Sequence, residues 1–219
     1  MKRTNYCSLI FRRSRFKRLL AFLIFSSILA GSPGFAQQQF LTDGSSELDQ
    51  MEKRISELTL GMVLLQGQSP EKLNQSDRDV LKIAIESGDY TKRYFAIMGE
   101  ACDYYKSTSY GLVDVTELAR ANAQAQRAEL EDHLAHLETA LELLTPQSRN
   151  NIVNTVNDLV ASGATKNTGI MDHERVAARF PDTFKENFAN VCDRVEIMKA
   201  QIESGENIYG SSTITIGQD

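Results

Sequence analysis

Apolar side chains return every three or four residues along several long stretches of this chain. The pattern runs through residues 48–65, resumes over 94–105 and is repeated near the end over 184–202. Alternating steps of three and four keep side chains on one face of an α-helix, because the helix turns once every 3.6 residues. The apolar members are Leu48, Met51, Ile55, Leu58, Met62 and Leu65, then Tyr94, Met98, Ala101 and Tyr105, then Phe184, Phe188, Val191, Val195, Met198 and Ile202. Long helices are therefore expected to dominate the fold.

Each of five helical stretches begins with a side chain that can accept hydrogen bonds from free amide groups. These start signals are Ser45 or Ser46, Ser76 with Asp79, Asp114 with Glu117, Thr145 followed by proline, and Thr183 with Glu186. The alternation typical of strands occurs only over residues 213–216, near the C-terminus. We predict an all-α fold, an antiparallel helical bundle of about four long helices plus short helices.

The first 36 residues are typical of a secretory signal peptide. Seven Lys and Arg residues, with no acidic residue among them, precede an apolar run over 19–30. Gly34 and Ala36 then supply the small residues that a cleavage site before Gln37 requires. The apolar run is shorter than the roughly 20 residues that a membrane span needs. We predict cleavage near Ala36 and a periplasmic or secreted protein with no membrane attachment afterwards.

Cleavage there divides the chain into a signal peptide (1–36), a polar leader (37–44), a helical bundle domain (45–205) and a flexible tail (206–219). The whole chain has 24 Lys and Arg residues and 29 Asp and Glu residues. Loss of the seven basic residues of the signal leaves 17 basic and 29 acidic residues, a net charge of −12. Such a protein repels phosphate backbones and anionic lipid headgroups, so nucleic acid and membrane surfaces are not expected partners.

Two of the three cysteines, Cys102 and Cys192, remain after cleavage. An even pair in an oxidising compartment favours a disulfide over two buried free thiols. Each cysteine lies four residues after a member of an apolar seam, Met98 in one case and Phe188 in the other. A disulfide would therefore join the second helical region to the last helix where their seams meet.

A candidate metal site lies in the longest predicted helix. His133 and His136 are three residues apart, and Glu129 precedes His133 by one turn. Two imidazoles and a carboxylate on one flank of a helix can converge on a divalent ion if another helix supplies a further ligand. The alternative is a solvated flank, since Glu131 and Glu138 continue its acidic character. No other cofactor is indicated.

Motifs of common enzymes are absent from the sequence, which has no G-x-S-x-G, P-loop, C-x-x-C or H-E-x-x-H. Glu86-Ser87 resembles the catalytic Glu-Ser of the lytic transglycosylases, which are helical exported enzymes. The chain lacks the glycine-rich, Met-Gln-containing stretch that follows in that family, and Glu86-Ser87-Gly88 is more simply interpreted as a helix end. We therefore predict a protein that is not an enzyme, with an unrecognised cell-wall enzyme as an alternative.

Several tyrosines lie in and just after the second helical region. One core cannot accommodate all of them, so Tyr90, Tyr104 and Tyr110 are candidates for an interaction surface. Exposed aromatic side chains suit protein interfaces, whereas tyrosines at a core boundary with wet hydroxyls are the alternative. The leading hypothesis is a non-catalytic binding or scaffold protein of the periplasm that acts through helix faces. Its expected partners are proteins, a second copy of the chain included, and a divalent-metal-binding or sensor bundle is the alternative.

Overall fold

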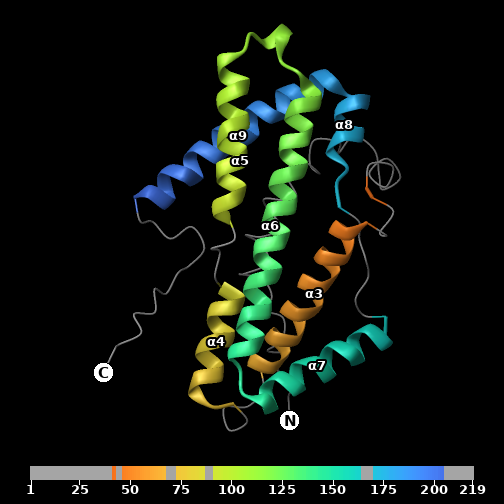
Figure 1. The fold of residues 1–219 in the computed structure, drawn as a ribbon, viewed down its shortest axis with the longest axis vertical. Helices are drawn as coiled ribbons and strands as arrows, with labels where there is room; N and C mark the ends of the chain where they lie inside the picture. The colour runs from red at the N-terminus through yellow and green to blue at the C-terminus, as the bar shows by residue number, and fades with distance from the viewer. Residues whose placement is uncertain (1–40, 43–45, 68–72, 87–90, 164–169, 205–219) are drawn as a thin grey trace, which may run out of the picture. The chain divides into compact units, whose positions relative to one another are not determined.

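The computed structural model describes residues 41–42, 46–67, 73–86, 91–163 and 170–204. Within these residues the chain is predominantly helical, as predicted, with seven α-helices, one short 3-10 helix and no β-strand (Figure 1). The predicted signal peptide, most of the leader and the tail lie outside the described residues. None of the helices in the described part is long and apolar enough to cross a membrane.

The first long helix, α3 (Glu47–Gln66), begins where the sequence predicted. Ser46 is its N-cap, because the Ser46 hydroxyl accepts a hydrogen bond from the amide of Asp49 and the Asp49 carboxylate accepts one from the amide of Ser46. The same buried carboxylate accepts hydrogen bonds from the hydroxyl of Thr42 and, at 3.0 Å, from the amide of Ile170. One side chain thus holds the start of α3 both to Thr42, seven residues earlier, and to Ile170, 121 positions away in the sequence.

The second helical region consists of α4 (Gln75–Glu86) and α5 (Thr91–Ser107), and the residues between these two helices, 87–90, lie outside the described part. The start of α4 differs from the prediction. The side-chain carbonyl of Asn74 accepts a hydrogen bond from the amide of Asp77 at 2.7 Å, whereas Ser76 and Asp79 lie inside the helix. Asn74 is favoured over Ser76 as the N-cap of α4 because Asp77, three residues after Asn74, is buried by contacts with a helix distant in the sequence.

The longest helix, α6 (Val115–Leu143), packs against α3, α4, α5 and α8 (His173–Arg179). Asp114 is its N-cap, as predicted. The remaining helices are α7 (Pro146–Ala161), which packs chiefly on α3, and α9 (Pro181–Glu203), which crosses α5 obliquely (Figure 1). The last helix starts two residues before the predicted cap at Thr183, because Pro181 suits the first turn of a helix, where its missing N–H is not needed.

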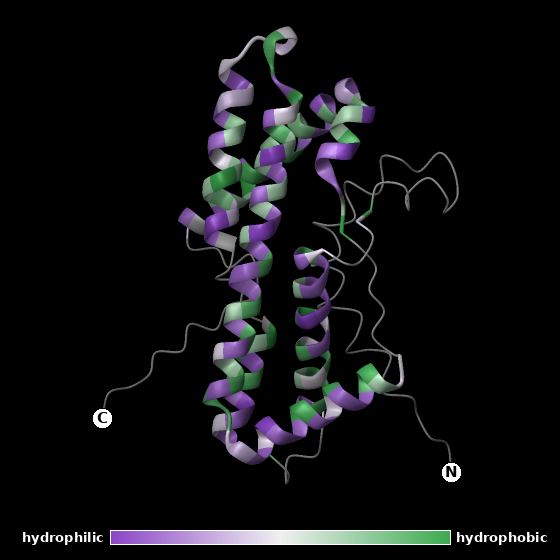
Figure 2. Cartoon of the chain, turned by 45° about the vertical axis from the view of Figure 1, so that its right-hand side comes forward, coloured by the Kyte–Doolittle hydropathy of each residue, from purple (hydrophilic) through white to green (hydrophobic). Residues whose placement is uncertain are grey.

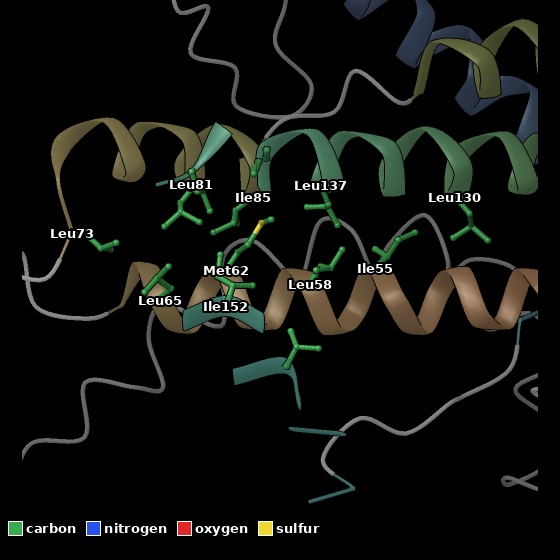
Figure 3. Close-up of a cluster of buried hydrophobic side chains, with 14 of the residues drawn as sticks. Ile55, Leu58, Met62, Leu65, Leu73, Leu81, Ile85, Leu130, Leu137 and Ile152 are labelled. Carbon is green, nitrogen blue, oxygen red and sulfur yellow. The ribbon is translucent and has the colours of Figure 1, made fainter. Parts of the chain in front are cut away.

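An apolar core lies between α3, α4, α6 and α7, and it contains the apolar seam predicted for α3. Leu58, Met62, Leu81, Leu137 and Ile152 are all within 1 % of complete burial. In Figure 3 the labelled side chains of α3 and α6 follow the same order along both helices, whereas those of α4 follow the opposite order. Helices α3 and α6 therefore run in one direction and α4 in the other.

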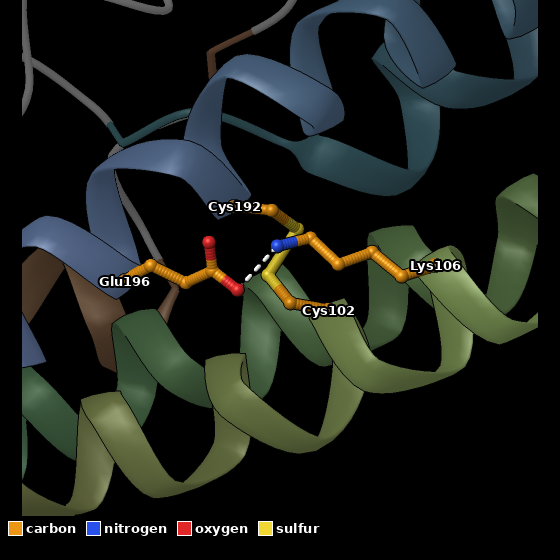
Figure 4. The surroundings of a disulfide bond; sticks show 4 residues. All are labelled: Cys102, Lys106, Cys192 and Glu196. Carbon is orange, nitrogen blue, oxygen red and sulfur yellow. Dashed lines mark hydrogen bonds and ion pairs between the residues drawn. A yellow bond between two sulfur atoms is a disulfide. The ribbon is translucent and has the colours of Figure 1, made fainter.

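The predicted disulfide between Cys102 and Cys192 joins α5 to α9, with 5.4 Å between the two Cα atoms. Both cysteines are buried. One turn beyond each cysteine, Lys106 and Glu196 form an ion pair beside the bond (Figure 4). This pair is exposed and contributes little to stability, so the disulfide and the apolar contacts around it are what fix α9 on α5.

Candidate functional site

The surface of α7 differs from that of every other long helix in carrying almost no charge. Only two of its 16 residues, Arg149 and Asp158, are charged, against eight of 23 in α9 and five of 12 in α4. In a protein with an excess of acidic residues, a helix with so few charges is unusual. Depletion of charge is also what distinguishes the centres of protein interfaces from the rest of a protein surface.

Arg149 is engaged within the fold. Its guanidinium donates hydrogen bonds to the backbone carbonyls of Leu141, Glu142 and Leu144, the first at 3.1 Å. These carbonyls belong to the end of α6, where backbone acceptors have no partner within the helix and where a positive charge is favourable. Asp158 is consequently the one charged side chain that α7 presents outward.

The outward face of α7 has a regular pattern. Asn150, Val153, Asn157 and Val160 follow steps of three, four and three, and all four are exposed. Val153 and Val160 are 40 % and 45 % exposed, although the sequence pattern assigns them to the same apolar series as the buried Ile152. We call these four residues the α7 seam.

The face of α7 that adjoins the two seam valines is held on α3. Ile152 and Val156 are buried there and lie against Gly61 of α3. A Cβ atom on Gly61 would come within 3.0 Å of Val156 Cγ2 and 3.2 Å of Ile152 Cγ2. Only a residue without a side chain lets the two helices approach so closely. The contact fixes which face of α7 points outward.

The start of α7 is fixed by the buried carboxylate of Asp77 in α4. Thr145 caps α7, as predicted, and both its amide (3.0 Å) and its hydroxyl (2.7 Å) donate hydrogen bonds to Asp77. The hydroxyl of Ser148 donates another. Burial alone would raise the pKa of Asp77, but the bonds from Ser148 and Thr145 outweigh it and the pKa lies below its usual value. Two helix N-termini, those of α4 and α7, thus share one negative charge.

The predicted metal ligands lie on an inward-facing polar series of α6 that the sequence analysis did not identify. Asn122 and Gln126, each 7 % exposed, precede Glu129, His133 and His136 with alternating steps of four and three. Burial raises the pKa of Glu129 to about 7, so this carboxyl carries a proton for much of the time near neutral pH. No group of three or more His, Cys, Asp or Glu residues within the described part is arranged to hold a metal ion.

The three predicted interface tyrosines are not brought together. The hydroxyl of Tyr104 accepts a hydrogen bond from the amide of Asp114, so this residue supports the turn before α6. Tyr110, in the 3-10 helix Tyr110–Leu112, is 50 % exposed and lies under the ammonium group of Lys185, 5.5 Å from the ring centre. Tyr90 lies outside the described residues. Of the two predicted tyrosines that the structure describes, Tyr110 is the one with the surface position that the interface hypothesis requires.

Hydropathy alone does not reveal the α7 seam. In Figure 2, hydrophilic and hydrophobic residues both occur along α7, as they do along α6. Asparagine has nearly the same hydropathy as a charged residue, yet it lacks a charge and both donates and accepts hydrogen bonds. The signal available in the sequence was the three-four spacing of Asn150, Val153, Asn157 and Val160, beside the near absence of charge.

No family model matches this chain, and comparisons with curated proteins and with solved structures found no significant match.

Proposed function

We propose that this chain is a non-catalytic, exported binding protein that engages protein partners through the outward face of α7. The observation that carries the proposal is the α7 seam, two exposed valines and two exposed asparagines on a helix with two charges in 16 residues. We also infer that the long helices act together as one antiparallel bundle, whose role is to present this face rigidly. The disulfide between α5 and α9 suits a protein that works outside the cytoplasm.

Binding energy at a protein interface comes from apolar side chains that lose water, within a surface that is not crowded by unpaired charges. Val153 and Val160 meet the first condition and their uncharged neighbours meet the second. Because Ile152 and Val156 anchor the adjoining face on α3, the partner would meet a helix that is already ordered. A preordered surface loses little conformational entropy on binding.

The proposal is tested by photo-crosslinking in living cells that export the full chain. A photoreactive residue replaces Asn157 in the α7 seam, and a matched control replaces Asn190, an exposed asparagine of α9. We expect a discrete crosslinked product from position 157 that the double substitution Val153→Glu and Val160→Glu abolishes, and none from position 190. Equal, unspecific products from both positions, or none from position 157, would overturn the proposal.

A divalent-metal or sensor role is the second candidate, and the inward position of Glu129, His133 and His136 on one continuous helix favours it. Calorimetric titration with zinc, copper and nickel tests it directly. A metal-dependent heat that disappears in the His133→Ala, His136→Ala double variant would support this function. No heat, or a heat that the double substitution leaves unchanged, would exclude the site.

Export is part of the proposal and is tested separately. Intact-mass measurement of the protein recovered from the periplasm is expected to give a chain that begins at Gln37 and is lighter by two hydrogens than the fully reduced form. A full-length chain retained in the cytoplasm with both thiols free would contradict it.

A further inference from the structure

We infer that the partner of the α7 seam is a second copy of this chain, with the two α7 helices packed face to face. The inference rests on the proposed function, because it names the occupant of the same surface. Three observations bear on it: the charge of the protein, the order of residues in the seam and the type of polar group within it.

Charge limits where two copies can meet. Each exported copy carries a net charge of −12, so most of the surface of one copy repels most of the other over the roughly 8 Å reach of electrostatics in physiological salt. The outward face of α7 has a single acidic side chain, Asp158, at its edge. Among the long helices of the described part, α7 has the smallest share of charged residues, so like-charged copies meet little repulsion along this face. A basic partner, by contrast, would be drawn to the acidic helices and would gain little from this face.

The order of residues in the seam matches helix pairing. Steps of three, four and three place Asn150 and Asn157 at one type of core position and Val153 and Val160 at the other, as in two heptads of a coiled coil. Ridges of this spacing pack into the grooves of an identical helix at a shallow crossing angle. The seam from 150 to 160 is about 16 Å long at 1.5 Å per residue, which suits a short and reversible contact.

The two asparagines of the α7 seam restrict which chemical groups can lie opposite them in a complex. A side-chain amide that is removed from water needs both a donor and an acceptor, or its burial is unfavourable. An identical helix supplies both, because the amide of one copy can pair with an amide of the other. A single asparagine in a helix-pairing seam is a known means of fixing register and the number of chains at some expense in stability. An isologous contact satisfies this requirement through symmetry alone.

The inference is tested by sedimentation velocity on the oxidised protein without its signal peptide, at rising concentration. One helix pair lies at the small end of interface sizes, so we expect a reversible dimer with a Kd on the order of tens of micromolar. Val153→Glu with Val160→Glu should leave a monomer at every concentration. Gln147→Glu, an exposed substitution on the same helix but outside the seam, should leave the dimer unchanged. Far-UV circular dichroism verifies that each variant is folded.

A third variant gives a change of opposite sign. Asn157→Val replaces a buried amide in the pair by an apolar side chain, so it should tighten self-association by roughly tenfold or drive larger assemblies. A wild-type protein that stays monomeric at several hundred micromolar, or a dimer unaffected by the glutamate pair, would overturn the inference. If the wild type is monomeric but position 157 still crosslinks a different protein in cells, self-association fails while the proposed function stands. If neither occurs, both fail.

Discussion

Asp77→Asn is expected to destabilise the protein strongly, although the substitution changes little in size. The carboxylate is 2 % exposed and accepts three hydrogen bonds from α7 or its cap, two from Thr145 and one from Ser148. Asparagine has one acceptor oxygen in place of two, and its amide group would face hydroxyl groups that now donate to the carboxylate. The start of α7 would lose the group that fixes it to α4.

The magnitude follows from the number of bonds lost. A hydrogen bond to a charged group contributes about 1.5–3 kcal/mol, so three independent bonds would sum to about 4–9 kcal/mol. The three bonds share one carboxylate and are not additive, and the hydroxyl groups of Thr145 and Ser148 can rotate to new partners. We therefore expect a loss of about 3 kcal/mol in the free energy of unfolding, which is less than the sum for three independent bonds.

Urea denaturation at pH 7 measures this loss, and Asp79→Asn is the matched control. Asp79 lies on the same helix but is exposed, and its carboxylate accepts a side-chain bond from Gln75 alone among the described contacts. The control should change stability by less than about 0.5 kcal/mol. Equal effects of the two substitutions would refute the role assigned to the buried carboxylate.

The pH dependence provides a second readout of the same residue. Because the pKa of Asp77 lies below its usual value in the folded protein, its contribution is present above the unfolded-state pKa and is lost as pH falls through the folded-state pKa. Wild-type stability should fall steeply below about pH 4, and the Asp77→Asn variant should show a shallower fall. A parallel decline of both proteins would contradict the assignment.

Three further predictions concern other parts of the fold. Burial raises the folded-state pKa of Glu129 to about 7, above its unfolded value, so wild-type stability should fall as pH rises from about 4.5 to 7. In urea denaturation at pH 8, Glu129→Gln should be more stable than the wild type by about 2 kcal/mol. A variant less stable than the wild type at that pH would contradict this. Replacement of both Cys102 and Cys192 by alanine should lower the free energy of unfolding by about 4–5 kcal/mol, because the disulfide closes a loop of 90 residues in the unfolded chain. The reduced wild type should unfold at the same urea concentration as this variant. A clear difference between the two would count against the chain-entropy explanation. Gly61→Leu should destabilise by at least about 2 kcal/mol through overpacking against Val156, whereas Gly99→Leu, where nothing lies within 4 Å of an added Cβ, should be neutral or stabilising; thermal unfolding compares the two.

Long-range periodicity and local capping account for the parts of the fold that the sequence predicts. The seam from Leu48 to Leu65, the caps at Ser46, Asp114 and Thr145 and the disulfide depend on local pattern or on simple pairing, and all are present. The cap of α4 was predicted wrongly because Ser76 and Asn74 are both good caps locally. The choice between them is made by Asp77, whose burial against Thr145 involves residues 68 positions away.

The candidate site was less accessible to sequence reasoning. An apolar series such as Ile152, Val153, Val156 and Val160 does not reveal how many of its faces are covered, because that depends on the number of neighbouring helices. Since α7 packs chiefly on α3, its second face stays exposed. In α6 the opposite occurs: Asn122 and Gln126 are buried because several helices surround that segment, although their polarity favours a surface position.

The rate of thiol labelling at the α7 seam reports whether the outward face of α7 is occupied in the cell. Cys102 and Cys192 are joined in the disulfide and Cys7 lies in the predicted signal peptide, so after the proposed cleavage Asn157→Cys would provide the one thiol that a small reagent can modify. Asn190→Cys on α9 is the reference for an exposed position. If the outward face of α7 is a binding surface, position 157 should be labelled at least tenfold more slowly in the periplasm of living cells than in purified, diluted protein, while position 190 is labelled equally in both. Equal rates at position 157 in the two conditions would show that this face is not occupied.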